Sequence, residues 1–148
     1  MNAIELLHRL AKIREDQAMA RAKRVASQVN QQKAFKDQVL EYAKDYESQM
    51  LAGGKGGASV AFIQDANAFR EKLLHSAIEM DGQIQGLARA SEDTLKTATM
   101  ARMRTRGLSK LVDKMHREAK RKQAKAELSQ FEDNFSARLS FKSGTKDA

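Results

Sequence analysis

The residues that could do chemistry are few and widely spaced. The three histidines stand at positions 8, 75 and 116, so no two share the i, i+4 helix face of metal-binding motifs. The neighbouring carboxylates Glu92 and Asp93, like those at 132 and 133, point about 100° apart on a helix, whereas acid–base catalysis needs convergence in a dry pocket. We therefore expect no catalytic, metal or cofactor site, and the sequence indicates that the protein is not an enzyme.

A glycine-rich segment, residues 52–59, has four glycines in five residues around Lys55. A phosphate-binding P-loop places Ser or Thr directly after its Gly-Lys pair and follows a strand, whereas here Gly56 follows and no strand is expected. Each glycine costs a helix about 1 kcal/mol relative to alanine. The segment therefore predicts a flexible turn, with Ser59 as the N-cap of the next helix.

Charge is the strongest chemical signal. Residues 102–128 hold ten basic and three acidic residues, a local charge of +7, whereas the whole chain carries +8. Basic residues three or four apart share one stripe of a helix, and further lysines widen it. We call the following residues the basic stretch: Lys110, Lys114, Arg117, Lys120, Arg121 and Lys125.

The basic stretch predicts an anionic partner, with a solvated charged helix as the alternative. No aromatic residue lies between 102 and 128 to stack on nucleic-acid bases. The apolar side of this helix uses Ala and Met, not the Trp and Phe that anchor helices in membranes. An acidic protein cleft is therefore favoured, and no nucleic-acid partner is expected.

A heptad pattern must position this stretch. It begins at Leu73 and keeps a 3-4 spacing to Ala126, which predicts one long helix with a narrow buried seam. The seam positions are Leu73, Ala77, Met80, Ile84, Leu87, Ser91, Thr94, Ala98, Ala101, Thr105, Leu108, Val112, Met115, Ala119, Lys122 and Ala126.

An earlier helix is expected to pack on this seam. Its predicted inner residues are Ala11, Ala18, Ala22, Val25, Val29, Phe35, Val39, Tyr42 and Tyr46. A short turn between two long helices makes them antiparallel, and partner numbers should add to about 110, which pairs Tyr42 with Phe69. The seam around Ala18 and Ser91 is made of small residues that bury little area, so we expect it to be the weakest part.

The fold class predicted is all-α, a long antiparallel two-helix coiled coil, or α-helical hairpin. We expect one coiled-coil domain over 1–148, with helices at 3–51 and 60–139 and a flexible tail at 140–148. Charged residues make up 31% of the chain and aromatic residues 5%, with no Pro or Cys, which suits helices and excludes a disulfide framework. No apolar run approaches the roughly 20 residues of a membrane span, and the charged start is unlike a signal peptide, so we expect a soluble cytoplasmic protein.

The second helix outruns the first beyond Gly107. Its remainder must overhang, bend back at Gly107 or bind something else, and an unpaired overhang favours self-association as one alternative. Leu128, Phe131, Phe135 and Leu139 lie on a different face from Met115, Ala119 and Ala126, so the apolar register changes there.

The order of features resembles a known family. Tyr42 and Tyr46 precede the glycine-containing turn, Phe69 and Leu73 follow it, and a long basic segment closes in 131–138. Together these motifs resemble the FliJ family of flagellar export proteins and, more distantly, the YscO-type stalk proteins of virulence secretion systems. Two departures are Glu132-Asp133, where the family commonly has the reverse order, and Met80, where it often has Gln.

The resemblance implies an accessory stalk similar to the central stalk of a rotary ATPase. It implies three kinds of partner: the export ATPase hexamer and its regulator, the cytoplasmic domain of the export gate protein, and export chaperones that the protein escorts. It also implies a cytoplasmic protein held peripherally at the membrane through the export apparatus. A virulence-system stalk and a nucleic-acid-binding coiled coil remain the alternatives.

The resemblance also implies where the partners bind. The basic stretch would enter the ATPase ring. The gate protein would contact Phe69, Leu73, Ser76 and Met80. Leu73 and Met80 are also seam positions in the heptad, so core packing and gate binding compete as their roles.

Overall fold

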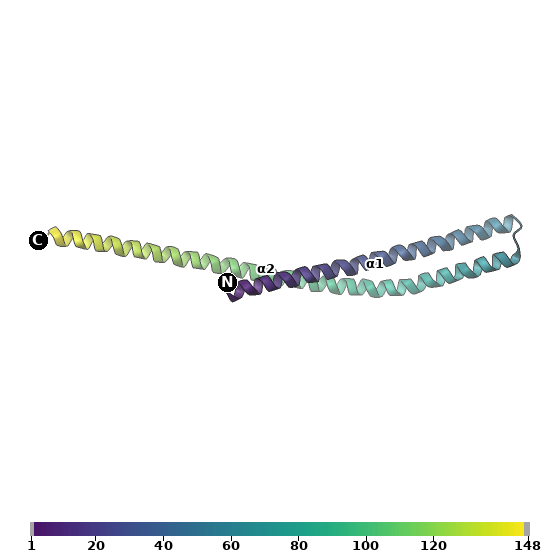
Figure 1. The fold of residues 1–148 in the computed structure, drawn as a ribbon, viewed down its shortest axis with the longest axis horizontal. Coiled ribbons are helices and arrows are strands. Elements are labelled where there is room, and N and C mark those ends of the chain that lie inside the picture. Colours follow the sequence, from purple (N-terminus) through teal and green to yellow (C-terminus); the bar gives the residue numbers. More distant parts are fainter. Residues whose placement is uncertain (1, 147–148) are drawn as a thin grey trace. The chain divides into compact units, whose positions relative to one another are not determined.

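Two long helices make up nearly all of the chain that the structure describes. The computed structural model describes residues 2–146, with side chains to Lys142. Helix α1 spans Ala3–Lys55, helix α2 spans Val60–Lys146, and the described residues contain no strand (Figure 1). The two helices pack against each other as an α-helical hairpin, which confirms the predicted fold class.

Two compact units share these helices. The hairpin unit is Ile13–Arg102, and the end unit combines the chain up to Lys12 with the chain from Met103 onward. The predicted helix 60–139 extends to Lys146 without interruption at Gly107, and residues 147–148 of the predicted tail lie outside the described residues. A Cβ built at Gly107 would meet no atom within 4 Å, so no close approach requires glycine at this position.

The predicted seam of α2 is confirmed as far as Met115. Every seam position from Leu73 to Met115 is buried or half-buried, and Ala98 has no exposed surface. The same spacing already begins at Ile63, earlier than the sequence analysis placed it. Ala119, Lys122 and Ala126 are exposed, so the predicted seam is wrong beyond Met115.

The inner face of α1 follows a 3-4 spacing that the sequence analysis traced incompletely. Phe35 and Tyr42 were expected inside, but they are 56% and 52% exposed because they fall off this spacing. The same spacing includes further buried or half-buried residues that the sequence analysis missed. Four of them are polar, namely His8, Glu15, Gln32 and Lys36, and three are apolar, namely Ile4, Ala43 and Met50.

One polar member of this face, Lys36, has a charged partner on α2. Lys36 lies within the seam spacing, and its Nζ forms an ion pair with Asp81 Oδ1 of α2 at 2.9 Å. Beside it, Val39, Ala77 and Met80 form the apolar core of the hairpin unit. The lysine stem thus packs along the seam while its charged end reaches a carboxylate at the edge.

The turn is shorter than predicted, because α1 continues through the first two glycines. Gly57 has a φ of 80°, and the amide of Ala58 donates to the carbonyl oxygen of Gly53 at 2.9 Å. This is the six-residue hydrogen bond of a Schellman motif, with Gly57 in the left-handed position that glycine favours. A Cβ at Gly53 would lie 3.3 Å from the Cβ of Ala58, so that glycine lets the chain return closely.

The later turn shifts the pairing of the helices. Tyr46, not Tyr42, contacts Phe69, with ring centroids 4.8 Å apart. The offset is one helical turn, as expected when the centre of the turn moves toward residue 58. Ser59 caps α2 as predicted, because its Oγ accepts from the amide of Phe62 at 3.2 Å.

Candidate interaction surfaces

The first candidate surface lies near the turn, where the sequence predicted gate-binding residues. Phe69 is 46% exposed although its ring packs on Tyr46. Ser76 is half-buried and borders a shallow groove on α2 that also contains His75 and Glu79. These two residues therefore offer accessible atoms to a partner.

The other two predicted gate residues belong to the core. Met80 is 8% exposed within the apolar cluster, and Leu73 is half-buried against the same cluster. The side chain of Met80 thus has little surface left for a partner in this structure. Leu73 keeps an accessible edge.

A groove of about 260 Å³ adjoins Phe69 at the end of the hairpin unit. It is lined by aromatic and polar side chains from both helices. The lining residues are Tyr46, Gln49, Phe62, Asp65, Ala66 and Phe69. Phe62 is 49% exposed and Tyr46 is half-buried, so their rings are incompletely covered.

The second candidate surface is the basic stretch. All six of its residues are exposed, and they belong to α2 in the end unit. Seam residues Leu108, Val112 and Met115 are half-buried on the same helix, whereas every described residue from His116 to Lys142 is exposed. A partner can therefore reach this part of α2 from all sides.

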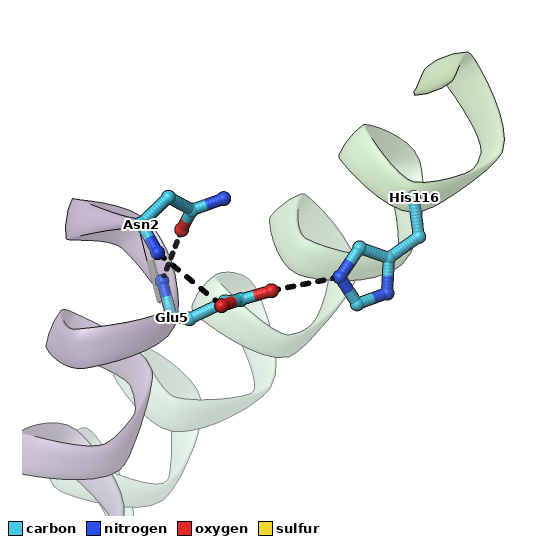
Figure 2. Close-up of polar contacts among 3 residues, drawn as sticks. All are labelled: Asn2, Glu5 and His116. Atoms are coloured by element: carbon cyan, nitrogen blue, oxygen red, sulfur yellow. Dashed lines mark hydrogen bonds and ion pairs between the residues drawn. The ribbon is translucent and has the colours of Figure 1, made fainter. Parts of the chain in front are cut away.

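A cluster of polar contacts that the sequence analysis did not predict ties the start of α1 to α2. Asn2 Oδ1 accepts from the amide of Glu5 at 2.8 Å, and Glu5 Oε2 accepts from the amide of Asn2 at 3.3 Å. This reciprocal arrangement is a capping box, and its sequence signal was the Asn-x-x-Glu spacing at the chain start. Glu5 Oε1 also lies 2.9 Å from His116 Nε2, as Figure 2 shows.

The position of Glu5 affects its ionisation. The hydrogen bond from His116 and the hydrogen bond from the Asn2 amide hold the pKa of Glu5 below its ordinary value, since both favour the carboxylate. The contact with His116 is an ion pair only when the imidazole is protonated. This cluster therefore couples the first turn of α1 to the start of the exposed part of α2.

The part of the chain that the structure describes contains no group of three or more His, Cys, Asp or Glu residues that could hold a metal ion. Neither helix, over its described residues, is long and apolar enough to cross a membrane.

One comparison with known proteins identifies relatives. A family model described as "Flagellar FliJ protein" matches residues 1–145. No curated protein and no solved structure matches the chain. The match covers both helices, the turn and the basic stretch.

Proposed function

The chain belongs to the flagellar FliJ family and is a flagellar export-related protein, and from this premise we propose that it is an accessory stalk of the flagellar type III export apparatus. In this proposal the basic stretch of α2 enters the ring of the export ATPase and promotes its activity. The family match favours the flagellar system over the virulence alternative.

The exposure of the basic stretch is the observation that supports this proposal most directly. Beyond His116 every described side chain of α2 is exposed, so a ring could surround this part of the helix. The stretch lies within the segment that carries ten basic and three acidic residues. An acidic lumen would attract such a helix at long range and orient it along the pore.

The test is the ATP hydrolysis rate of the cognate export ATPase, titrated with this protein. We expect saturable stimulation by the natural chain. A variant with Arg117, Lys120, Arg121 and Lys125 each changed to Glu should lose that stimulation, because reversal converts attraction into repulsion.

A matched control changes four exposed basic residues of α1, namely Arg14, Lys23, Arg24 and Lys33, to Glu. The control alters the net charge by the same amount but leaves the basic stretch intact, so it should stimulate as the natural chain does. Equal stimulation by all three proteins would contradict the proposed role of the stretch. Salt-dependent binding to DNA or RNA without any effect on the ATPase would favour the nucleic-acid alternative.

A second part of the proposal concerns the export gate. We propose that its cytoplasmic domain binds around Phe69, with Ser76 and the accessible edge of Leu73, while Met80 supports this surface from inside. The exposure of Phe69 supports this assignment. Aromatic rings that are partly exposed and backed by a firm core are frequent anchors of protein interfaces.

Binding of the gate domain to Phe69→Ala and Ile78→Ala variants tests this surface. Phe69→Ala should weaken binding at least tenfold, as expected for an interface anchor. Ile78 is 70% exposed on the same helix but outside the predicted set, so Ile78→Ala should bind normally. Equal affinities of both variants and the natural chain would remove Phe69 from the interface.

The remaining parts of the proposal are chaperone escort, contact with the ATPase regulator and a place at the cytoplasmic face of the membrane. All three derive from family membership. Co-purification of export chaperones with the natural chain, and recovery of the protein with membranes only when the export apparatus is present, would support them. Membrane recovery without the apparatus would contradict the proposed localisation.

A further inference from the structure

Four large apolar side chains lie uncovered near the end of α2. We call Leu128, Phe131, Phe135 and Leu139 the apolar stripe; their exposed fractions run from 53% to 66%. The rings of Phe131 and Phe135 stack on each other with centroids 6.4 Å apart and planes 12° apart. The two rings together form one continuous apolar surface, and its exposure to water is energetically unfavourable.

The stripe does not continue the seam that α1 covers. Seam spacing from Met115 leads to Ala126, and Leu128 lies two residues later, about 200° further around the helix. The stripe instead shares a face with Arg117 and Arg121 of the basic stretch. None of the residues whose side chains the structure describes covers the stripe.

We propose that the apolar stripe pairs with the same stripe of a second copy, antiparallel, to form a reversible dimer. The order Leu, Phe, Phe, Leu is nearly symmetric about the midpoint between Phe131 and Phe135. A twofold axis at that midpoint places Leu128 against Leu139 of the second copy and Phe131 against Phe135 of the second copy. Such self-complementarity is what an isologous interface requires.

Charges beside the stripe select the antiparallel direction. Glu127 and Arg138 flank the stripe on one side, and the antiparallel register brings Glu127 of each copy next to Arg138 of the other. A parallel pair would instead bring Glu127 toward Glu132 of the second copy and Lys120 toward Lys125 of the second copy. Like charges at both sites oppose the parallel arrangement.

The same carboxylates disfavour a lipid surface as the occupant. Glu127 stands beside Leu128 on one flank of the stripe, and Glu132 stands beside Phe131 on the other flank. A helix lying in an anionic bilayer would press both carboxylates toward the headgroups, where cations are favoured. A second copy supplies an arginine for Glu127 instead.

The dimer is expected to be weak. Each stripe side chain exposes on the order of 100 Å², so one copy contributes roughly 400 Å², about half of what a stable interface buries on each partner. Glu132 also lies near the twofold axis, close to Glu132 of the second copy. Association should therefore appear above about 1 µM and strengthen in a Glu132→Gln variant.

Disulfide mapping tests the register, because the chain has no cysteine of its own. Two full-length variants, Leu128→Cys and Leu139→Cys, are oxidised separately and as a mixture in which one carries a larger tag. The antiparallel register predicts a cross-linked product that contains both chains and little product from either variant alone, since like positions lie roughly 16 Å apart along the helix. Cross-linking of each variant with itself would overturn the register.

Sedimentation equilibrium tests the dimer independently. A Phe131→Glu/Phe135→Glu variant should weaken association more than a hundredfold, whereas Leu95→Glu, an exposed leucine outside the stripe, should not. Glu127→Arg or Arg138→Glu alone should weaken it about fivefold, and the double reversal should restore it. A chain that stays monomeric at all concentrations, or that binds anionic vesicles through the phenylalanines instead, would overturn the proposal.

This dimer goes beyond the proposed function, and its test is separate. It needs neither the ATPase nor the gate protein, so its failure would leave the stalk proposal untouched. Self-pairing covers residues 127–139, so any partner that takes the same face competes with the second copy. Stimulation of the ATPase is then expected to fall at protein concentrations where the dimer dominates.

Discussion

Alanines at equivalent heptad positions are buried in one region of α2 and exposed in another. In the hairpin unit, Ala98 at a seam position has no exposed surface. Ala126 keeps the same heptad register in the end unit and is exposed. The difference is the presence of α1, which offers a complementary face to the first residue and none to the second. A heptad therefore predicts which side of a helix is apolar, and burial depends on whether a partner reaches that side.

Replacing each of the two alanines by a charged residue tests this contrast, and of all the predictions it should have the largest effect on stability. Ala98→Glu should lower the free energy of unfolding by about 3 kcal/mol or more, because it buries an uncompensated charge. Ala126→Glu should change it by less than about 0.5 kcal/mol. Urea denaturation followed by helical circular dichroism measures both, and equal effects would remove the distinction between the regions.

Replacing glycine by alanine should change stability in opposite directions in the two regions. Gly57→Ala should destabilise the hairpin by about 1 kcal/mol, because alanine resists the left-handed conformation at φ 80°. Gly107→Ala should stabilise α2 by up to about 1 kcal/mol, since the position is helical and faces open space. Thermal melting of the two variants checks this, and destabilisation by Gly107→Ala would indicate a bend that needs glycine.

The ion pair between the helices of the hairpin unit should have a modest effect on global stability. The Lys36 side chain is 28% exposed, and its Nζ lies 2.9 Å from the Asp81 carboxylate. An Asp81→Asn variant removes the negative charge of that carboxylate. We expect a loss of about 0.5–1 kcal/mol that shrinks in high salt, because the pair is partly solvated. A loss that is independent of salt would mean that packing of the lysine stem, and not charge, is responsible.

The corresponding contact in the end unit should act locally and produce the smallest effect. Because His116 and the Asn2 amide lower the pKa of Glu5, the folded state binds this proton less readily than the unfolded chain does. The stabilisation of the folded state by these two hydrogen bonds is therefore fully present above the ordinary glutamate pKa of about 4.3. It is lost as the pH falls through the lowered pKa of Glu5 in the folded state.

Carboxyl NMR titration of Glu5 measures this effect. In a His116→Ala variant the pKa of Glu5 should rise toward its ordinary value, while Gln123→Ala, at an exposed position on the same helix, should leave it unchanged. An unchanged pKa in the histidine variant would show that the capping box alone determines the ionisation of Glu5.

Much of the fold follows from the sequence because the spacing of apolar residues along a helix is a local property. The seam from Leu73 to Met115 could be predicted from spacing alone. The inner face of α1 could be predicted only in part, because Glu15 and Lys36 occupy seam positions that an apolar search rejects. The sequence predicts the start of the turn too early, because the low helix propensity of glycine is outweighed where tertiary packing continues a helix.

The candidate surfaces were less accessible to sequence reasoning. Exposure of the basic stretch followed from the length difference between the helices. The burial of Met80 followed from the heptad, but its neighbour Val39 depended on the pairing of the two helices, which a shift of one helical turn changes. The contact between Glu5 and His116 joins residues 111 positions apart, so only the folded structure brings it into view.

Hydrogen exchange of the natural chain tests the central contrast most directly. The measurement compares backbone amides of α2 at residues 73–98 with those at 120–140, at a concentration too low for dimers. Because local stability depends on packing, the account predicts that the later segment exchanges at least about a hundredfold faster. Equal protection of the two segments would contradict the claim that α2 is unsupported within the chain beyond Met115.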